Sequence, residues 1–231
     1  MTQRQIAIQQ GELQELSSKI QTSQGDRVPY LGRIVALDAQ GVNCSGILPI
    51  CIHAPDFMLP SYIKGRRFVG ILDENYFDAN QNLQQQIIQS VLNDFEKPEP
   101  LLKGIAVRHA GKLANDSNVD KLVPVILRGT SSDDPYVRKA SALAILNLHH
   151  TKPSFIDRFK LGPILKNLVE DSNPNVASNA ICAYSEISNT TSSSLFEITI
   201  EMIDNLLNSI EDATEWSQIH ILEFIRDFKD N

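Results

Sequence analysis

The chain's five histidines are the side chains best suited to acid–base or metal chemistry: His53, His109, His149, His150 and His220. Adjacent residues on a helix point about 100° apart, and no carboxylate follows His149 and His150 at ligand spacing. The His-Glu dipeptides that hold iron in some helical-repeat enzymes do not occur in this sequence. We therefore expect ordinary packing or helix-end histidines and no metal site.

Motifs for other catalytic chemistry are also missing from the sequence. It contains no G-x-G-x-x-G, P-loop, G-x-S-x-G or H-E-x-x-H pattern. Acidic pairs such as Asp133-Asp134 and Glu211-Asp212 stand where helices are expected to begin, and there capping or the helix dipole explains them. The sequence predicts a protein that is not an enzyme, with no catalytic residue and no cofactor.

Basic residues form two candidate binding groups. Lys64, Arg66 and Arg67 crowd one expected helix start, and Arg138 and Lys139 crowd another. A solvated helix face explains both groups, while the functional alternative is contact with an acidic partner or with acidic lipid headgroups. Each charge near an anionic membrane is worth about 1 kcal/mol. The net charge of −7 argues against broad nucleic-acid binding, which requires a basic surface.

The elements that position these residues repeat along the chain. Four similar segments combine an apolar residue with a basic or small one at an expected helix start: Ser61–Arg66, Pro100–Ile105, Pro135–Ala140 and the degenerate Pro174–Asn179. Their equivalent residues Lys64, Lys103, Arg138 and Ala177 are spaced by 39, 35 and 39 positions. This period is typical of a helical-hairpin solenoid of the HEAT or armadillo type.

A second set of prolines supports the same register. Pro124 and Pro163 each lie 11 residues before the proline that opens the following helix, Pro135 or Pro174. We expect them near the start of the first helix of each hairpin, where the missing N–H has no helical partner.

Helix caps and small residues complete the predicted hairpins. Asp134 and Asn173 are placed to cap the second helices. Close approach of successive helices is predicted at five small residues: Ala110, Ala140, Ala144, Ala180 and Ala183.

The ends of the chain are expected to differ from the middle. Residues 1–27 read as an N-terminal helical segment, and residues 28–231 as the solenoid. Met202–Ile210 and Trp216–Phe228 form a last hairpin, on which we expect three exposed apolar side chains: Phe224, Ile225 and Phe228. Exposure there would imply a continuation of the solenoid or a partner.

Composition is compatible with a cytoplasmic protein. The 231 residues are 42% hydrophobic and 21% charged, which is ordinary for a globular chain. The first residues contain no apolar core long enough for a secretory signal, and no run in the sequence approaches 18 apolar residues, so we expect neither a signal nor a membrane span. Cys44, Cys51 and Cys182 lack any C-x-x-C pairing, so free, buried thiols in a reducing compartment are expected.

Five co-linear segments carry a resemblance to a known family: GELQEL at Gly11–Leu16, LLKGIAVR at Leu101–Arg108, DPYVRKA at Asp134–Ala140, DSNPNVASNA at Asp171–Ala180 and TEWSQIHIL at Thr214–Leu222. In this order and at these separations they resemble the N-terminal trunk of the β subunits (β-adaptins) of clathrin-adaptor complexes. The likeness spans nearly the whole chain and is weakest over Val28–Gln86.

The resemblance implies an all-α, right-handed α-α superhelix of about four to five hairpins that acts as a non-enzymatic coat subunit. Its expected partners are a second large, a medium and a small adaptor subunit, on coated vesicles at the Golgi, endosomes or plasma membrane. The family docks an Arf-family GTPase through an apolar spot, which matches Ile88 in Leu83–Leu92; Gln85 departs from that character, and core packing explains Ile88 equally well. We expect an incomplete trunk without the family's hinge and appendage, which leaves direct clathrin binding in doubt.

Three other interpretations remain open from the sequence. The chain could be a generic HEAT-repeat scaffold outside vesicle coats, such as a transport receptor or phosphatase scaffold. A helical-repeat enzyme would contain a bound metal or cofactor. A truncated, non-functional adaptin copy would be unstable alone.

Overall fold

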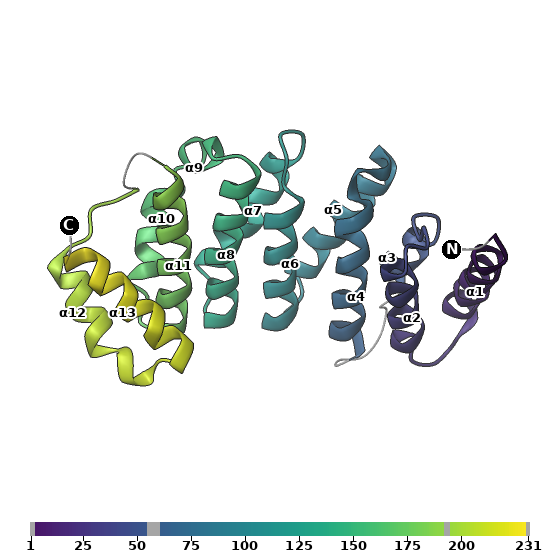
Figure 1. Cartoon of the computed structure of the whole chain (residues 1–231), viewed down its shortest axis with the longest axis horizontal. Coiled ribbons are helices and arrows are strands. Elements are labelled where there is room, and N and C mark those ends of the chain that lie inside the picture. Colours follow the sequence, from purple (N-terminus) through teal and green to yellow (C-terminus); the bar gives the residue numbers. More distant parts are fainter. Residues whose placement is uncertain (1–2, 55–60, 192–194, 230–231) are drawn as a thin grey trace. The chain divides into compact units, whose positions relative to one another are not determined.

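The computed structural model describes residues 3–54, 61–191 and 195–229, and all regular secondary structure in this part of the chain is helical (Figure 1). It contains thirteen α-helices and two short 3₁₀ helices, and no strand occurs in these ranges. No helix among them is both long and apolar enough to cross a membrane. The predicted all-α fold is confirmed. The chain forms two compact units, Met1–Asn93 and Asp94–Asn231.

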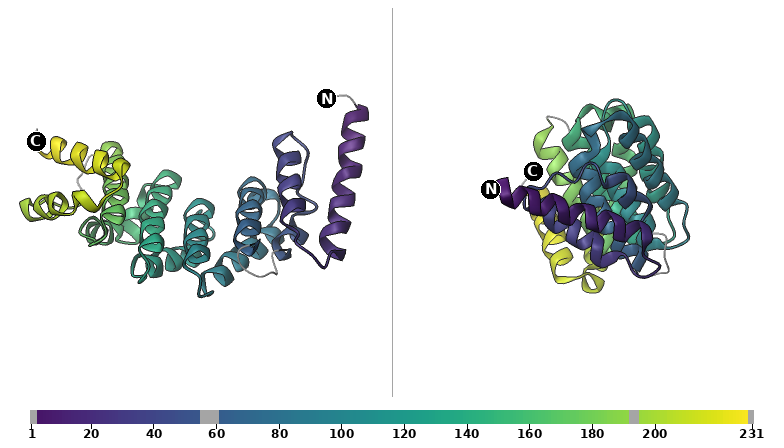
Figure 2. Two further views of the ribbon diagram at one scale, coloured as in Figure 1. Left: turned by 90° about the horizontal axis from the view of Figure 1, so that it is seen from below. Right: turned by 90° about the vertical axis from the view of Figure 1, so that its right-hand side faces the viewer.

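The first unit begins with a long helix, α1 (Gln3–Thr22), which runs alongside the next helix, α2 (Val28–Ala39) (Figure 2). Arg33 of α2 binds Glu12 of α1 with Nε–Oε1 and Nη2–Oε2 distances of 2.5 and 3.0 Å. The predicted N-terminal helical segment contains α1, whereas the domain boundary at residue 28 stays a prediction. The helices are α1 (Gln3–Thr22), α2 (Val28–Ala39), α3 (Leu48–His53), α4 (Ser61–Tyr76), η1 (Phe77–Ala79) and α5 (Gln81–Phe95), whose last two residues belong to the second unit.

The second unit is a stack of helical hairpins. Its second helices form one layer, in which α6 packs on α8, α8 on α11 and α11 on α13, while α7 packs against α6 and α8 (Figure 1). The helices are α6 (Pro100–Leu113), α7 (Val119–Thr130), α8 (Pro135–Thr151), α9 (Ser154–Arg158), α10 (Leu161–Val169), α11 (Pro174–Thr190), α12 (Ile200–Asn208), η2 (Ile210–Asp212) and α13 (Glu215–Lys229).

The predicted helix starts are confirmed. Ser61, Pro100, Pro135 and Pro174 are the first residues of α4, α6, α8 and α11. The last predicted hairpin corresponds to α12 and α13, with bounds that agree to within two residues.

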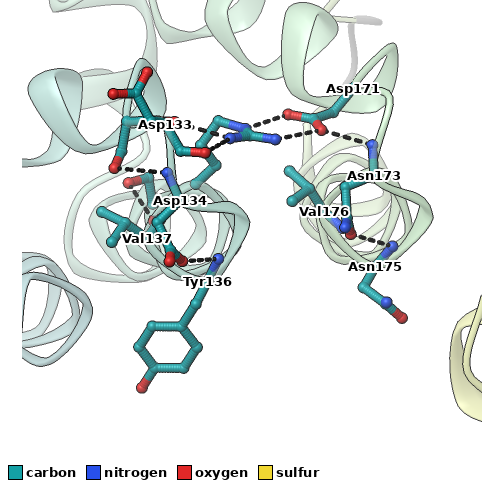
Figure 3. A network of polar contacts seen from close by, with 11 residues as sticks. Asp133, Asp134, Tyr136, Val137, Asp171, Asn173, Asn175 and Val176 are labelled. Atoms are coloured by element: carbon teal, nitrogen blue, oxygen red, sulfur yellow. Dashed lines mark hydrogen bonds and ion pairs between the residues drawn. The ribbon is translucent and has the colours of Figure 1, made fainter. Parts of the chain in front are cut away.

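Side-chain caps fix two of these starts, as the sequence predicts (Figure 3). The Asp134 carboxylate accepts the N–H of Tyr136 at 2.8 Å. The Asn173 side-chain oxygen accepts the N–H groups of Asn175 and Val176 at 3.0 and 3.3 Å. Both caps satisfy amide groups that would otherwise lack a partner in the first turn.

The position expected for Pro124 is wrong. Helix α7 begins at Val119, so Pro124 is its sixth residue and lies inside the helix. An additional turn precedes the proline because Asn118 closes a local network, donating its Nδ2 to the Leu113 carbonyl and accepting the N–H of Asn115. Pro163, the third residue of α10, is in the first turn as predicted.

The expectation of exposed aromatic residues on α13 is also corrected. Phe224 is buried because its ring meets Tyr184 edge-on, with centroids 5.9 Å apart. Ile225 is half-buried, and Phe228 lies outside the described side chains. Among the described side chains of α13, the large apolar ones that are exposed are instead Trp216, Ile219 and Leu222.

Close helix packing occurs where small residues were predicted. All five alanines are buried: Ala110, Ala140, Ala144, Ala180 and Ala183. Helices α6 and α8 approach closely at Gly111, where an added Cβ would lie 2.8 Å from the Cα of Ala144. Because the obstacle is backbone, neither helix can accommodate even a methyl group there without moving.

We expect Gly111→Ala to lower the free energy of unfolding by about 1–3 kcal/mol through overpacking of α6 against α8. The matched control is Gly11→Ala in α1, where an added Cβ meets no atom within 4 Å. The control should leave stability unchanged or raise it by up to about 1 kcal/mol through helix propensity. Urea titration followed by circular dichroism measures both; equal effects of the two substitutions would contradict the close approach.

Candidate partner-binding surface

The residues of the first predicted binding group, on α4, differ in how far they are exposed to solvent. Lys64 and Arg67 are exposed on α4, whereas Arg66 is only 1% exposed. On α5, Ile88 is 8% exposed and Gln85 is exposed. Lys64 and Arg67 therefore present their charges to solvent, and partner contact by any of these residues stays a prediction.

Arg138, from the second group, is held within the chain. Its Nε and Nη2 atoms donate to the two Asp171 carboxylate oxygens at 2.6 and 2.9 Å. Its Nη1 atom donates to the carbonyl oxygens of Ser132 and Asp133 at 2.8 and 3.0 Å. The hydrogen bond to the Asp171 carboxylate raises the pKa of Arg138 above its ordinary value. Arg138 thus joins two successive hairpins, and an additional partner contact stays a prediction.

Lys139 points elsewhere, since neighbouring residues on a helix are about 100° apart. Its Nζ lies 5.8 Å from the centre of the Tyr136 ring, and it forms no ion pair in the part of the chain that the structure describes. It lines a groove of about 420 Å³ together with residues of α8, α11 and α13 and of the turns before them: Pro135, Tyr136, Asn173, Asn175, Ser178, Asn179, Cys182, Thr214, Trp216, Ser217 and His220.

The repeat register explains why the surface is hollowed at this place. The lining positions are equivalent in successive hairpins: Tyr136, Asn175 and Ser217 correspond, as do Lys139, Ser178 and His220. Helix α11 contributes short side chains to the floor, and its neighbours contribute long ones to the walls. Figure 3 shows Tyr136 and Asn175 directed to the same side, away from Asp171.

Polar groups of the groove are only partly satisfied within the chain. The Asn175 side-chain oxygen accepts the hydroxyl of Ser217 at 3.0 Å and the N–H of Thr214 at 3.3 Å. The Nδ2 of Asn179 donates to the main-chain carbonyl oxygen of Asn175 at 2.7 Å. Within the described residues, the Nδ2 of Asn175 and the Oδ1 of Asn179 have no partner. One donor and one acceptor are therefore available to a ligand.

The lining carries positive charge but no carboxylate. Lys139 and His220 are its titratable nitrogen groups, and His220 lies 3.8 Å from Glu223, which is outside the lining. Burial raises the pKa of Cys182 in the groove floor, so its thiol is a poor nucleophile. These groups can bind a ligand, but they do not pair a nucleophile with a base.

The two adjacent histidines bind the following hairpin. The Nε2 of His149 lies 2.7 Å from the Thr190 hydroxyl, and burial lowers the pKa of His149. The Nε2 of His150 lies 2.8 Å from a Glu186 carboxylate oxygen. Among the described side chains, no group of three or more His, Cys, Asp or Glu residues is arranged to hold a metal ion.

Sequence reasoning identified Lys139 but missed the other groove residues. Tyr136, Asn175, Asn179, Trp216 and His220 are ordinary residues in three separate helices. Alignment of the repeats contained the usable signal, because it places Tyr136, Asn175 and Ser217 at one register position.

Stacked hairpins with a repeated register and a partly polar groove define a helical-repeat protein of the solenoid class. The chain belongs to the family described as the adaptin N terminal region, which matches residues 5–231. It is similar to AP-1 complex subunit beta-1 of Mus musculus and of Homo sapiens, with 27% identity over 220 residues in each case. These alignments cover 94% of this chain and 23% of each relative.

AP-1 complex subunit beta of Dictyostelium discoideum is similar as well, with 25% identity over 213 residues, 92% of this chain and 22% of that protein. The chain therefore spans less than a quarter of the length of these relatives. The predicted resemblance to β-adaptins is confirmed.

Thiol accessibility tests the placement of the three cysteines. Burial raises the pKa of Cys44 to about 11 and that of Cys51 to about 12, and both side chains are buried. At pH 8 a thiol with a pKa of about 11 is ionised in about one molecule in a thousand. The expected burial is wrong for Cys182, which also has a raised pKa but is partly exposed because it lines the groove.

We expect a maleimide to modify Cys182 first in the folded chain, and all three cysteines at similar rates in urea. Peptide mapping by mass spectrometry measures the order. Modification of Cys44 or Cys51 as fast as Cys182 without denaturant would contradict their burial.

Proposed function

We propose that the chain is a non-enzymatic scaffold of a vesicle-coat adaptor complex and works by binding the other subunits. The observation that carries the proposal is the family match over residues 5–231, together with relatives whose names are those of adaptor β subunits. Its expected partners are a second large, a medium and a small subunit, and its role is to support cargo sorting in vesicle-mediated transport.

The second unit has the physical properties that a scaffold needs. Side chains at repeat spacing connect one hairpin to the next, including Arg138–Asp171 and the exposed pairs Lys152–Asp116 and Arg158–Asp120. Hairpins held in register present a preorganised surface, so little conformational freedom is lost when a partner binds. Affinity in such interfaces comes from buried apolar and aromatic anchors, with charges setting orientation.

Two finer contacts belong to the same proposal. Lys64 and Arg67, both exposed, are suited to an acidic membrane surface or an acidic partner. The region of Ile88 is proposed for an Arf-family GTPase, which would have to reach a side chain that is 8% exposed. Direct clathrin binding forms no part of the proposal.

An affinity purification of the tagged chain from its own cells, with quantitative mass spectrometry, tests the proposed function. We expect a second large, a medium and a small adaptor subunit in amounts comparable to the chain. The destabilised variant Gly111→Ala should recover less of the three subunits, because it weakens the packing of the second unit. Recovery of chaperones alone, or of unrelated stoichiometric partners, would contradict the coat role.

A further inference from the structure

We propose that the groove over α11 binds an extended peptide segment of a partner protein that bears a carboxylate and an apolar side chain. The inference rests on the geometry of α8, α11 and α13 and does not depend on the coat role.

The groove has the dimensions of a short extended strand. The part of the groove that α11 lines extends from the cap residue Asn173 to Cys182. This distance along the helix is about 13 Å, at 1.5 Å per residue. About four residues of extended chain, at roughly 3.3 Å each, cover the same distance. A volume of about 420 Å³ is sufficient for their main chain and part of their side chains.

The floor offers the hydrogen-bonding groups that a peptide main chain needs. An extended segment exposes one N–H donor and one carbonyl acceptor per residue. The unused Nδ2 of Asn175 complements a carbonyl, and the unused Oδ1 of Asn179 complements an N–H. Asn175 is held in place by Ser217 and Thr214, so its amide is oriented before a ligand arrives.

Charge selects an acidic ligand on the α8 side of the groove. Lys139 has no ion-pair partner among the described residues, and no carboxylate lines the groove, although the chain carries a net charge of −7. On the opposite side, Glu223 lies beside His220, and both Glu223 and Glu186 raise the pKa of Cys182. The ligand carboxylate is therefore assigned to the Lys139 wall, where a charge-assisted hydrogen bond can form.

The wall contributed by α13 supplies the apolar contact. Trp216 is 75% exposed, the largest value among the exposed large apolar side chains of the described residues. An indole ring provides a broad apolar face at low cost in side-chain entropy, and such rings commonly anchor protein interfaces. A peptide side chain placed against Trp216 would remove this surface from water.

The test begins with selection of phage-displayed random octapeptides on the whole chain. Selected sequences should be enriched in Asp or Glu together with an apolar residue. Synthetic peptides of these sequences are then titrated while the fluorescence of Trp216, the chain's single tryptophan, is recorded. We expect its emission to shift to shorter wavelength, and peptide binding should slow maleimide modification of Cys182.

Two variants and one matched control locate the binding site. Lys139→Glu reverses the proposed charge contact, and Asn179→Phe fills the floor; each should weaken binding at least tenfold while the helical circular dichroism is kept. Lys121→Glu makes the same charge change at an exposed position of α7 outside the groove and should bind as the unmodified chain does.

Three results would overturn the inference. These are failure to enrich any peptide, enrichment without acidic residues, and equal binding by the Asn179→Phe chain. None of them affects recovery of adaptor subunits, so the peptide groove and the proposed function fail separately.

Discussion

In the second unit, the Arg138 guanidinium spans the space between two hairpins and meets the Asp171 carboxylate through two parallel hydrogen bonds. The same carboxylate accepts the N–H of Asn173 at 2.8 Å, and the same guanidinium binds the carbonyls of Ser132 and Asp133. One pair of charges thus fixes the turns that precede α8 and α11. Only 17% and 9% of the two side chains are exposed, so solvent screens the pair less than it would a surface pair.

The groove depends on these turns because they also contain the helix caps. Asp134 and Asn173 cap α8 and α11 at equivalent positions, so Tyr136 and Asn175 are directed to the same side, opposite the ion pair (Figure 3). Exposed pairs such as Lys152–Asp116 add orientation and little stability. Most of the stability comes from apolar residues buried between the helices, and close packing at Gly111 keeps α6 and α8 in contact. The proposed scaffold role requires both features: hairpins held in a fixed register, and a surface of those hairpins left exposed for a partner.

The helix starts were predictable from sequence because their determinants are local: a capping side chain followed by proline. Pro124 was misplaced because the Asn115–Asn118 turn, which depends on a carbonyl five residues away, adds a turn to α7. Burial was less predictable. Lys64 and Arg66 are two residues apart, yet one is exposed and the other buried, and Phe224 is covered by Tyr184 from another hairpin. The groove combines residues up to 85 positions apart, from Pro135 to His220, so no single segment contains its signal.

A double-mutant cycle on Arg138 and Asp171 tests most directly whether contacts at repeat spacing couple neighbouring hairpins. The free energies of unfolding of Arg138→Met, Asp171→Ala and the double variant are compared with that of the unmodified chain. A directly bonded, partly buried charge pair should give a coupling energy of about 1.5–3 kcal/mol. Additive effects, within about 0.5 kcal/mol, would show that the two hairpins are not coupled through this pair and would contradict the account.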